Sequence, residues 1–357
     1  MNLQNFVALA IRLYVRFFCR DVVLALGTGL VASGVASLTS LMALALSFVV
    51  DFKDWPTLAL VFGPDSSVSV NFALIVLGVV IVIYRMKQLE QRLTTLFIYL
   101  KGYDNMEERF PIDVIPAKYR YGKAFHLRYD TLHKTPQGAL EEIKRISGDI
   151  ARYVESNAAV SVKIFVAGRA FVPLQYAAGR VLGTRPEFEV MDFDRETGRW
   201  HFLDELDDGE RINLLDPANA ERVKESRQAA LVLPFTANIS NEQLPEGLRD
   251  VVYRFELEKG PRQDSMASKE KMEAILITVN QCIRNLRAEV DVLHVFAAVS
   301  TSTAVRLGCL FQSNIYPETR VYQFDTRTGG YTWALRLLAD KMEIVEDSSV
   351  LYQLNRV

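Results

Sequence analysis

Two long apolar segments dominate the first hundred residues. Residues Val22–Val50 carry no charged side chain, and a helix needs only about 20 apolar residues to cross a bilayer. A second uncharged segment, Ser66–Tyr84, has about the minimum length for a span. The first segment is too long, and starts too late, for a cleaved signal peptide. The pattern therefore predicts a hairpin of two membrane-spanning helices.

The residues that flank the spans predict their orientation. Arginines and a lysine precede the first span and follow the second, whereas the connector carries Asp51, Lys53, Asp54 and Asp65. By the positive-inside rule, both termini and the large C-terminal part are expected to face the cytoplasm. Residues 1–20 alternate arginines with apolar residues at helical spacing. They are expected to form an amphipathic helix in the inner interface, or a cytoplasmic extension of the first span.

One face of the first span consists of small and hydroxyl side chains. At about 100° per residue, these positions fall within an arc of about 80°, and they are Gly29, Ser33, Ser37, Ser40 and Ser47. Small residues allow helices to pack closely or to line a polar path. The stripe predicts either tight packing against the second span or a self-association face.

Beyond the spans, the pattern changes to that of an α/β protein. Residues 85–101 read as a helix that leaves the membrane, and residues 102–138 as a polar connector with three prolines. Residues 139–156 have an apolar side chain at every third or fourth position, which predicts an amphipathic helix.

The C-terminal part contains an internal repeat. Residues 162–200 and 293–331 align without a gap at an offset of 131, with nine of 39 positions identical. Seven of the nine lie within the 13 residues from Pro186 to Gly198, which supports a true duplication. Each copy reads as a buried strand, a small-residue loop, a helix, and a second strand that ends in an Asp/Thr/Gly turn. This order predicts two βαβ units with parallel sheets.

The first loop of each copy is a candidate binding site. Ligands of parallel sheets bind beyond the carboxyl ends of the strands, where helix N-termini offer N–H groups to anions. Loops 168–171 and 300–303 occupy that position, and side by side they would form one composite pocket. The hydroxyls of loop 300–303 suit phosphates, while Arg169 supplies charge and Phe171 a stacking face. Neither loop is a GxGxxG or P-loop motif, and each residue could instead cap a helix.

Composition limits the chemistry. The net charge of -2 excludes the global basic field of a protein that coats a nucleic-acid polymer. Three dispersed cysteines and four histidines predict neither a zinc site nor a disulfide framework. No catalytic arrangement of side chains is recognisable, so we expect no catalytic residue, no metal and no cofactor.

The second copy carries a family resemblance. The segments HVFAAVSTSTAVRLGCLFQ and VYQFDTRTGGYTWALRL resemble the second half of a SAVED domain, a fused pair of CARF-like units that senses cyclic oligonucleotides in bacterial CBASS antiphage systems. Preceded by two spans, the chain is similar to the transmembrane SAVED effectors of these systems. The resemblance implies an α/β fold with two fused Rossmann-like halves, residues 156–290 and 291–357. They would follow the hairpin and exit helix of residues 21–101 and the connector of residues 102–155.

The resemblance also implies a function. A cognate nucleotidyltransferase would make a cyclic di- or trinucleotide that binds between the halves. Bound domains would oligomerise, and their spans would disrupt the bacterial inner membrane and cause abortive infection, without enzymatic activity in this chain. Differences between the copies predict an asymmetric pocket, which fits a mixed-base or trinucleotide ligand. The candidate ligand-binding residues lie in the loops and turns at the strand ends, and are Gly168, Arg169, Phe171, Pro173, Asp194, Phe235, Thr236, Ser300, Thr301, Ser302, Thr303, Asp325 and Tyr331.

Two alternatives remain open. A membrane-anchored nucleotide-sugar glycosyltransferase would use Asp192 and Asp194 as a pair of carboxylates that share one divalent cation. The repeat disfavours this reading, because Asp192 corresponds to Gln323 in the second copy, whereas Asp194 corresponds to Asp325. The other alternative is a membrane scaffold that binds no ligand.

Overall fold

The computed structural model describes residues 76–84, 94–107, 109–120, 123–156, 162–183, 188–215, 219–311 and 316–346. The chain divides into two compact units, Met1–Arg92 and Leu93–Val357. In the first unit, residues 76–84 form a helix, and six of its nine residues carry exposed large hydrophobic side chains. The rest of the predicted spans, including the stripe from Gly29 to Ser47, lies outside the described residues. Within the described residues, no helix combines the length and hydropathy that a bilayer crossing requires.

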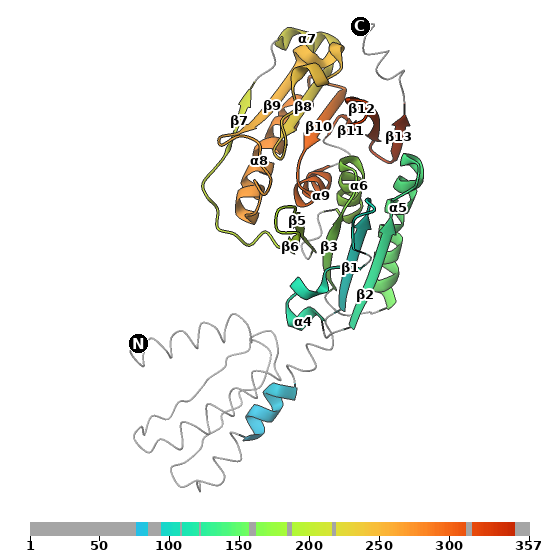
Figure 1. The fold of residues 1–357 in the computed structure, drawn as a ribbon, viewed down its shortest axis with the longest axis vertical. Helices are drawn as coiled ribbons and strands as arrows, with labels where there is room; N and C mark the ends of the chain where they lie inside the picture. Colours follow the sequence, from blue (N-terminus) through green and yellow to red (C-terminus); the bar gives the residue numbers. More distant parts are fainter. Residues whose placement is uncertain are drawn as a thin grey trace, which may run out of the picture. The chain divides into compact units, whose positions relative to one another are not determined.

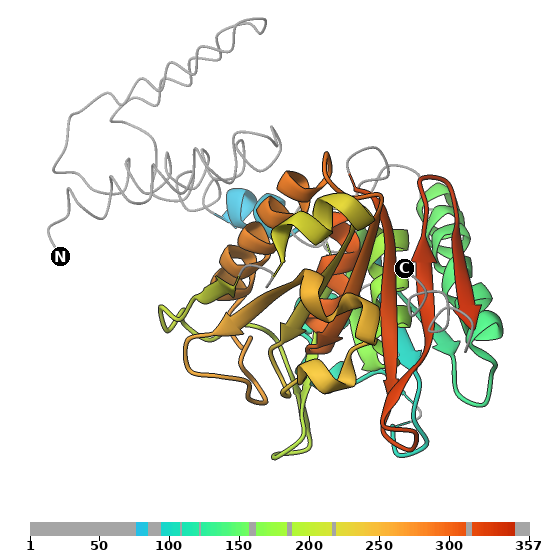
Figure 2. The ribbon, with the colours of Figure 1, turned by 90° about the horizontal axis from the view of Figure 1, so that it is seen from above.

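The second unit contains two sheets, with helices α6 (Val172–Leu182) and α9 (Thr301–Leu310) side by side between them (Figures 1 and 2). The first sheet is parallel, in the order β2-β1-β3-β4. Its strands are β1 (Thr94–Lys101), β2 (Lys123–Asp130), β3 (Val162–Arg169) and β4 (Phe188–Val190). A hairpin of β5 (Asp192–Asp194) and β6 (Arg199–His201) follows β4. Helix α5 (Pro136–Ser156) packs against α6 and β2, and the short elements η1 (Ile112–Val114) and α4 (Ala117–Arg120) lie between β1 and β2 in the sequence.

The second sheet is mixed, in the order β13-β12-β11-β10-β8-β9-β7. Strands β8, β9, β10 and β11 are parallel, while β7, β12 and β13 pair antiparallel with their neighbours. The strand bounds are β7 (Ile212–Leu215), β8 (Gln228–Pro234), β9 (Val252–Leu257), β10 (Val292–Ala298), β11 (Glu318–Asp325), β12 (Gly330–Leu337) and β13 (Met342–Glu346). The other helices of this half are α7 (Ala220–Ser226), η2 (Asn241–Gln243), η3 (Glu246–Val251) and α8 (Lys269–Leu286).

Strand β1 corrects the last eight residues of the helix predicted at 85–101, and residues 85–93 lie outside the described residues. Its eight residues pair with β2 on one side and β3 on the other, and all eight are buried. Leu96, Ile98 and Leu100 face one core, whereas Phe97 and Tyr99 face another. A strand that is buried on both faces is apolar throughout and lacks the period-2 alternation that identifies most strands. The predicted connector of residues 102–138 is also wrong in part, since it contains η1, α4 and β2. The helix predicted at 139–156 is confirmed as part of α5.

The two βαβ units predicted from the repeat are confirmed as β3-α6-β4 and β10-α9-β11. The ungapped alignment is wrong within the helices. Helix α6 begins at Val172 and α9 at Thr301, an offset of 129 rather than 131, so that Phe171 and not Arg169 corresponds to Ser300. Sheet membership also differs from the predicted boundary at residue 290. Strands β7 to β9 belong with β10 to β13, so the halves meet between β6 and β7.

Helices α6 and α9 cross at a pair of glycines. A Cβ atom added to Gly179 would lie 2.8 Å from the carbonyl carbon of Val305, and one added to Gly308 would lie 2.8 Å from that of Tyr176. Only glycine allows two backbones to approach so closely. Each helix also sends an arginine to the other half. The guanidinium of Arg180 lies 4.3 Å from the ring of Phe311. That of Arg306, in turn, lies 4.1 Å from the ring of Phe188.

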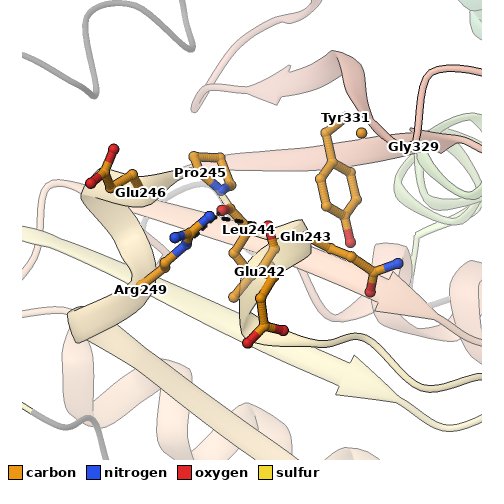
Figure 3. A pocket seen from close by; sticks show the side chains of 9 residues that line it. Glu242, Gln243, Leu244, Pro245, Glu246, Arg249, Gly329 and Tyr331 are labelled. Atoms are coloured by element: carbon orange, nitrogen blue, oxygen red, sulfur yellow. Dashed lines mark hydrogen bonds between the residues drawn. The ribbon is translucent and has the colours of Figure 1, made fainter.

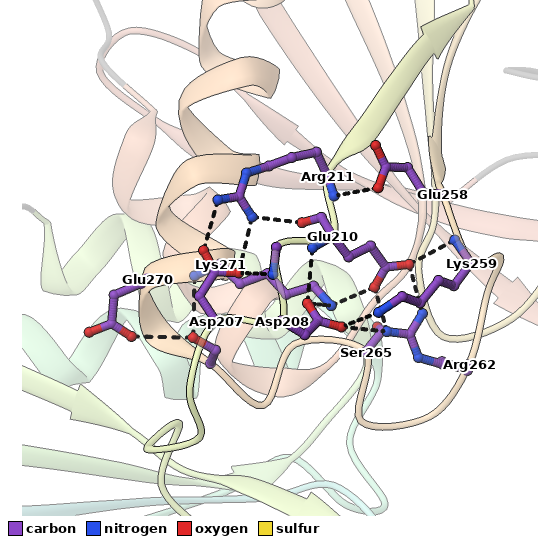
Figure 4. A network of polar contacts seen from close by, with 12 residues as sticks. Asp207, Asp208, Glu210, Arg211, Glu258, Lys259, Arg262, Ser265, Glu270 and Lys271 are labelled. Atoms are coloured by element: carbon purple, nitrogen blue, oxygen red, sulfur yellow. Dashed lines mark hydrogen bonds and ion pairs between the residues drawn. The ribbon is translucent and has the colours of Figure 1, made fainter.

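A charged network joins three segments of the second half, namely the loop before β7, the loop after β9 and the start of α8 (Figure 4). Glu210 is buried and accepts hydrogen bonds from Arg262, Lys271 and the backbone N–H of Lys259. Lys271 is only 3% exposed and also lies 3.1 Å from Asp208. Burial alone would raise the pKa of Glu210, but the hydrogen bonds from Arg262 and Lys271 outweigh it and lower the pKa to about 2.

His294 is a fully buried polar residue of β10. Its Nε2–H donates to the side-chain oxygen of Gln228 at 3.1 Å, and the hydroxyl of Tyr322 donates to Nδ1 at 2.9 Å. Both partners suit one neutral tautomer of the ring. Burial, together with the positive charge of Arg320, lowers the pKa of His294 to about 3.

Candidate functional site

The two predicted loops lie side by side at the carboxyl end of β3. The hydroxyl of Thr301 donates a hydrogen bond of 3.0 Å to the carbonyl oxygen of Gly168. The side-chain amide of Gln175, in the first turn of α6, donates to the Thr301 hydroxyl at 3.1 Å. The loops therefore meet through direct contacts between the halves, as the repeat led us to expect.

Gly168 and Pro173 shape the first loop. Gly168 has φ of 138°, and an added Cβ would lie 2.6 Å from the backbone nitrogen of Leu100, so only glycine fits between β3 and β1. Pro173 is buried in the first turn of α6, where a missing N–H costs nothing. Both residues hold the loop in place.

Phe171 lies at the centre of an exposed aromatic surface. Its side chain is 37% exposed. The ring is 5.8 Å from Tyr103, which follows β1, and 6.0 Å from Trp333 on β12, both at steep interplanar angles. Tyr103 is also exposed, whereas Trp333 is buried at the base. We call Tyr103, Phe171 and Trp333 the aromatic surface. It combines residues of both halves.

Arg169 borders the aromatic surface. Its guanidinium lies 4.5 Å from the ring of Phe193 and 5.8 Å from that of Tyr103, and Nη2 donates to the side chain of Asn105 at 3.0 Å. Within the described residues, its buried Nε has no hydrogen-bond partner. Burial, followed by the nearby positive charge of Arg195, lowers the pKa of Arg169. Arg169 and Arg195 therefore concentrate positive charge beside exposed rings.

The hydroxyls at the start of α9 already have protein partners. Ser300 is the N-cap and accepts from the N–H of Thr303. Ser302 donates both its N–H, at 2.8 Å, and its hydroxyl to the carboxylate of Asp192. Thr301, Ser302 and Thr303 are all buried. These groups therefore join the two halves, and that they face a ligand phosphate stays a prediction.

Asp192 is the partner that sequence reasoning did not foresee for α9. It is 5% exposed and lies on β5 of the first half. Burial raises the pKa of Asp192, whereas the hydrogen bonds from Ser302 act in the opposite direction. A helix N-terminus also favours the charged form of a carboxylate. Asp194, two residues later, accepts instead from Glu196 and Thr197 in the β5–β6 turn. The two carboxylates that the glycosyltransferase alternative would use are thus engaged separately by protein donors.

The remaining candidates lie elsewhere. Phe235 is fully buried, and its N–H donates to Ala298, so it belongs to the core. The N–H of Thr236 donates to the same carbonyl oxygen. Asp325 accepts from the N–H and guanidinium of Arg327 in the β11–β12 turn. The aspartates at 194 and 325 therefore have the turn-forming role that the Asp/Thr/Gly pattern also allowed.

Tyr331 lines a shallow hollow of about 290 Å³ at the carboxyl edge of the second sheet (Figure 3). The β11–β12 turn forms one side, and η2 and η3 form the other. Arg249 is fixed by the carbonyl oxygens of Leu244 and Glu242, and Glu246 points away from Tyr331. Tyr331 and Trp333 are two residues apart on β12. The hollow and the aromatic surface therefore share one strand.

Sequence reasoning missed Tyr103, Phe193 and Trp333. Tyr103 follows a strand that was read as a helix, so its place at a strand end was hidden. Phe193 and Trp333 lie within two residues of Asp194 and Tyr331, which were selected instead of them. A search for aromatic residues just beyond every apolar run would have found Tyr103 and Phe171 together. Within the described residues, no cluster of three metal-ligating side chains occurs.

The fold and the site define a fused pair of Rossmann-like α/β units whose strand ends meet at an aromatic and arginine-bearing surface. The family model for SAVED, the SMODS-associated and fused to various effectors sensor domain, matches residues 144–337. The chain belongs to the SAVED family. Strands β1 and β2 precede the matched residues but complete the first sheet.

Solved structures that match this chain include Acinetobacter baumannii Cap4, a SAVED/CARF-domain containing receptor. Its complex with the cyclic trinucleotide 2′3′3′-cAAA is 14% identical, with a TM-score of 0.45, over 73% of this chain and 54% of that chain. Its complex with 3′3′3′-cAAA is 12% identical, with a TM-score of 0.44, over 74% and 57%. Moraxella osloensis Cap4 is 13% identical, with a TM-score of 0.39, over 65% and 47%. This chain spans about half the length of these receptors, and no curated protein sequence matches it.

Proposed function

We propose that this chain is a membrane-anchored receptor of a bacterial antiphage system. Its SAVED domain binds a cyclic di- or trinucleotide that a cognate nucleotidyltransferase makes during infection. Bound receptors oligomerise, and the N-terminal spans then disrupt the inner membrane and cause abortive infection. The chain acts as a sensor and effector, and catalysis is not part of the proposal.

The aromatic surface beside Arg169 is the observation that carries the ligand class. Stacking of a base on an aromatic side chain contributes about 1–3 kcal/mol and requires no particular base. A guanidinium next to the rings supplies the charge that a phosphodiester needs. Phe171 and Tyr103 are exposed, and Arg169 lies within 6 Å of the Tyr103 ring. Together they suit a ligand that alternates bases with phosphates.

The unequal halves support a ligand that is not itself twofold symmetric. Phe171 has a different counterpart in the second copy, Ser300, when the helices are superimposed by their first residues. The hollow at Tyr331 belongs to the second half alone. A cyclic trinucleotide has three bases for these unequal surfaces, so we favour it over a symmetric dinucleotide.

Two features support the membrane output. Residues 76–84 form a helix without a charge, and its large apolar side chains are exposed, as the end of a lipid-facing span requires. The preceding sequence contains the longer uncharged segment Val22–Val50. Linkage requires that the assembled state binds the ligand more tightly than the monomer does. Ligand binding would thereby raise the local concentration of the spans.

The ligand is tested with a fragment of residues 93–357, which keeps the central strand β1. The thermal unfolding temperature is measured with a panel of cyclic di- and trinucleotides that includes both cAAA isomers. We expect one member to stabilise the wild type and Phe171→Ala to lose that shift. Leu206→Ala, which removes an exposed apolar side chain outside the aromatic surface, serves as the control and should keep it. If no member of the panel stabilises the wild type, the ligand-free scaffold becomes the better reading.

The output is tested with the full-length chain in dye-loaded vesicles. We expect ligand to increase the particle size in light scattering and to release the dye. Ser37→Leu should keep nucleotide binding but abolish the release, because it blocks the small-residue face. Equal release by this variant would assign the serine stripe to packing between the spans. An unchanged particle size at saturating ligand would refute assembly, even if binding is observed.

A further inference from the structure

The amino end of α9 is an anion site that the protein fills by itself. Helix N-termini attract anions because their first N–H groups lack partners within the helix. Here the N–H of Ser302 donates to Asp192 at 2.8 Å, that of Thr303 to the Ser300 hydroxyl, and that of Ala304 to the Ser300 carbonyl oxygen. These first-turn groups therefore have partners before any ligand arrives.

The corresponding end of α6 is built differently. Its N-cap Phe171 provides no side-chain acceptor, and Pro173 contributes no N–H. The N–H groups of Leu174 and Gln175 both donate to the carbonyl oxygen of Phe171. The two corresponding helices of the repeat therefore differ at their N-termini. Only α9 receives a carboxylate, and that carboxylate comes from the other half.

We propose that Asp192 is a positioning residue that takes the place of a ligand phosphate at α9. This inference rests on the proposed function. With α9 filled, the ligand phosphates bind at Arg169 and Arg195, while its bases bind at the aromatic surface. Asp192 directly precedes Phe193, whose ring lies 4.5 Å from the Arg169 guanidinium. The contact between Asp192 and Ser302 therefore also positions the Phe193 ring that Arg169 packs against.

Charge and burial support this arrangement. Asp192 is 5% exposed, and both of its carboxylate oxygens accept from Ser302. The negative charge of the Asp192 carboxylate repels a second anion from the same helix end. Arg169 and Arg195, in contrast, present positive charge at the exposed side of the surface. The negative charge of Asp192 and the positive charges of the two arginines therefore direct the ligand phosphates to the arginines and away from α9.

The test removes the carboxylate and then supplies it in solution. In full-length Asp192→Ala, the buried N–H and hydroxyl of Ser302 lose their acceptor. The unfolding temperature should fall by on the order of 5 °C. Formate, which is a carboxylate without a chain, should recover most of this loss, whereas equal concentrations of chloride should not. Wild type and Asp192→Asn, which keeps an acceptor for the Ser302 N–H, serve as controls and should not respond to formate. A formate effect equal in all three proteins would overturn the proposal.

The ligand arm uses the cyclic nucleotide that stabilises the wild type in the screen above. Asp192→Ala should bind it at least tenfold more weakly, and formate should strengthen the binding. If formate instead competes with the nucleotide, a ligand phosphate enters the end of α9 and the proposal is wrong. Ser302→Ala removes one donor only and should bind about threefold more weakly without a formate response, whereas tighter binding would also contradict the proposal. If no cyclic nucleotide binds the wild type, the proposed function fails, and the thermal effect of formate alone decides whether Asp192 fills an anion site.

Discussion

The crossing of α6 and α9 at two glycines makes a stability prediction with a built-in control. In Gly308→Ala, the new Cβ would lie 2.8 Å from the carbonyl carbon of Tyr176 and 3.0 Å from the nitrogen of Arg180. Carbon atoms prefer a separation of about 3.5–4.0 Å, so the helices must separate by about 0.7 Å or more. Overpacking of this kind costs about 1–3 kcal/mol. The upper end applies because the obstacle is backbone rather than a movable side chain.

Alanine also favours the helical state by up to about 1 kcal/mol relative to glycine. We therefore expect Gly308→Ala to lose about 2 kcal/mol of unfolding free energy, which lowers the unfolding temperature by about 4–8 °C. The matched control is Gly148→Ala in α5, where an added Cβ has no neighbour within 4 Å. It should gain up to about 1 kcal/mol. Urea unfolding of the 93–357 fragment measures both values. Equal effects of the two substitutions, or an unchanged Gly308→Ala, would refute the close crossing.

Two further predictions concern buried ionisable groups. The pKa of His294 is about 3 in the folded chain and about 6.5 when unfolded, so its contribution to stability is present above about pH 6.5 and is lost as the pH falls toward 3. When the pH falls from 7 to 5, the unfolding free energy of His294→Gln, measured with urea, should therefore decrease by about 2 kcal/mol less than that of the wild type. The same pH dependence of the unfolding free energy in both proteins would contradict this. Glu210→Ala leaves the buried ammonium of Lys271 without one of its carboxylates and should cost about 3–5 kcal/mol. Asp207→Ala, which breaks a more exposed pair with Arg211, should cost at most about 1 kcal/mol. Similar losses in these two variants would mean that burial does not set the energy of the network.

The repeat carried most of the fold prediction. Buried apolar runs, small-residue loops and the Asp/Thr/Gly turns were sufficient to predict both βαβ units, because parallel strands and their crossover helices leave a local pattern. The start of the domain was missed for a non-local reason. Strand β1 is apolar because β2 and β3 cover both of its edges and two cores cover its faces. Directly after two predicted spans, such a segment looks like the end of a membrane helix.

The site was predicted in outline but not in its chemistry. Arg169 and Phe171 were identified from the loop position, and the structure brings them together with Tyr103 and Trp333. Phe235 was placed at the site because it follows a strand, but its side chain turns into the core. Side-chain direction beyond a strand end depends on the loop conformation, and the sequence pattern does not specify it. The contact of Asp192 with Ser302 spans 110 residues, which no local pattern can reveal.

The hydroxyl-rich start of α9 shows why a loop that looks like a phosphate site can serve another purpose. Its N–H groups and hydroxyls retain the anion preference of a helix N-terminus, but the anion is a side chain of the other half. The same interaction that would have bound a ligand therefore fastens the two halves together. Thr301 adds a bond to Gly168 and Ser302 adds two to Asp192, while the glycine crossing holds the helix axes close. Two halves fixed at both the helix ends and the helix crossing have little freedom to close around a ligand as separate bodies.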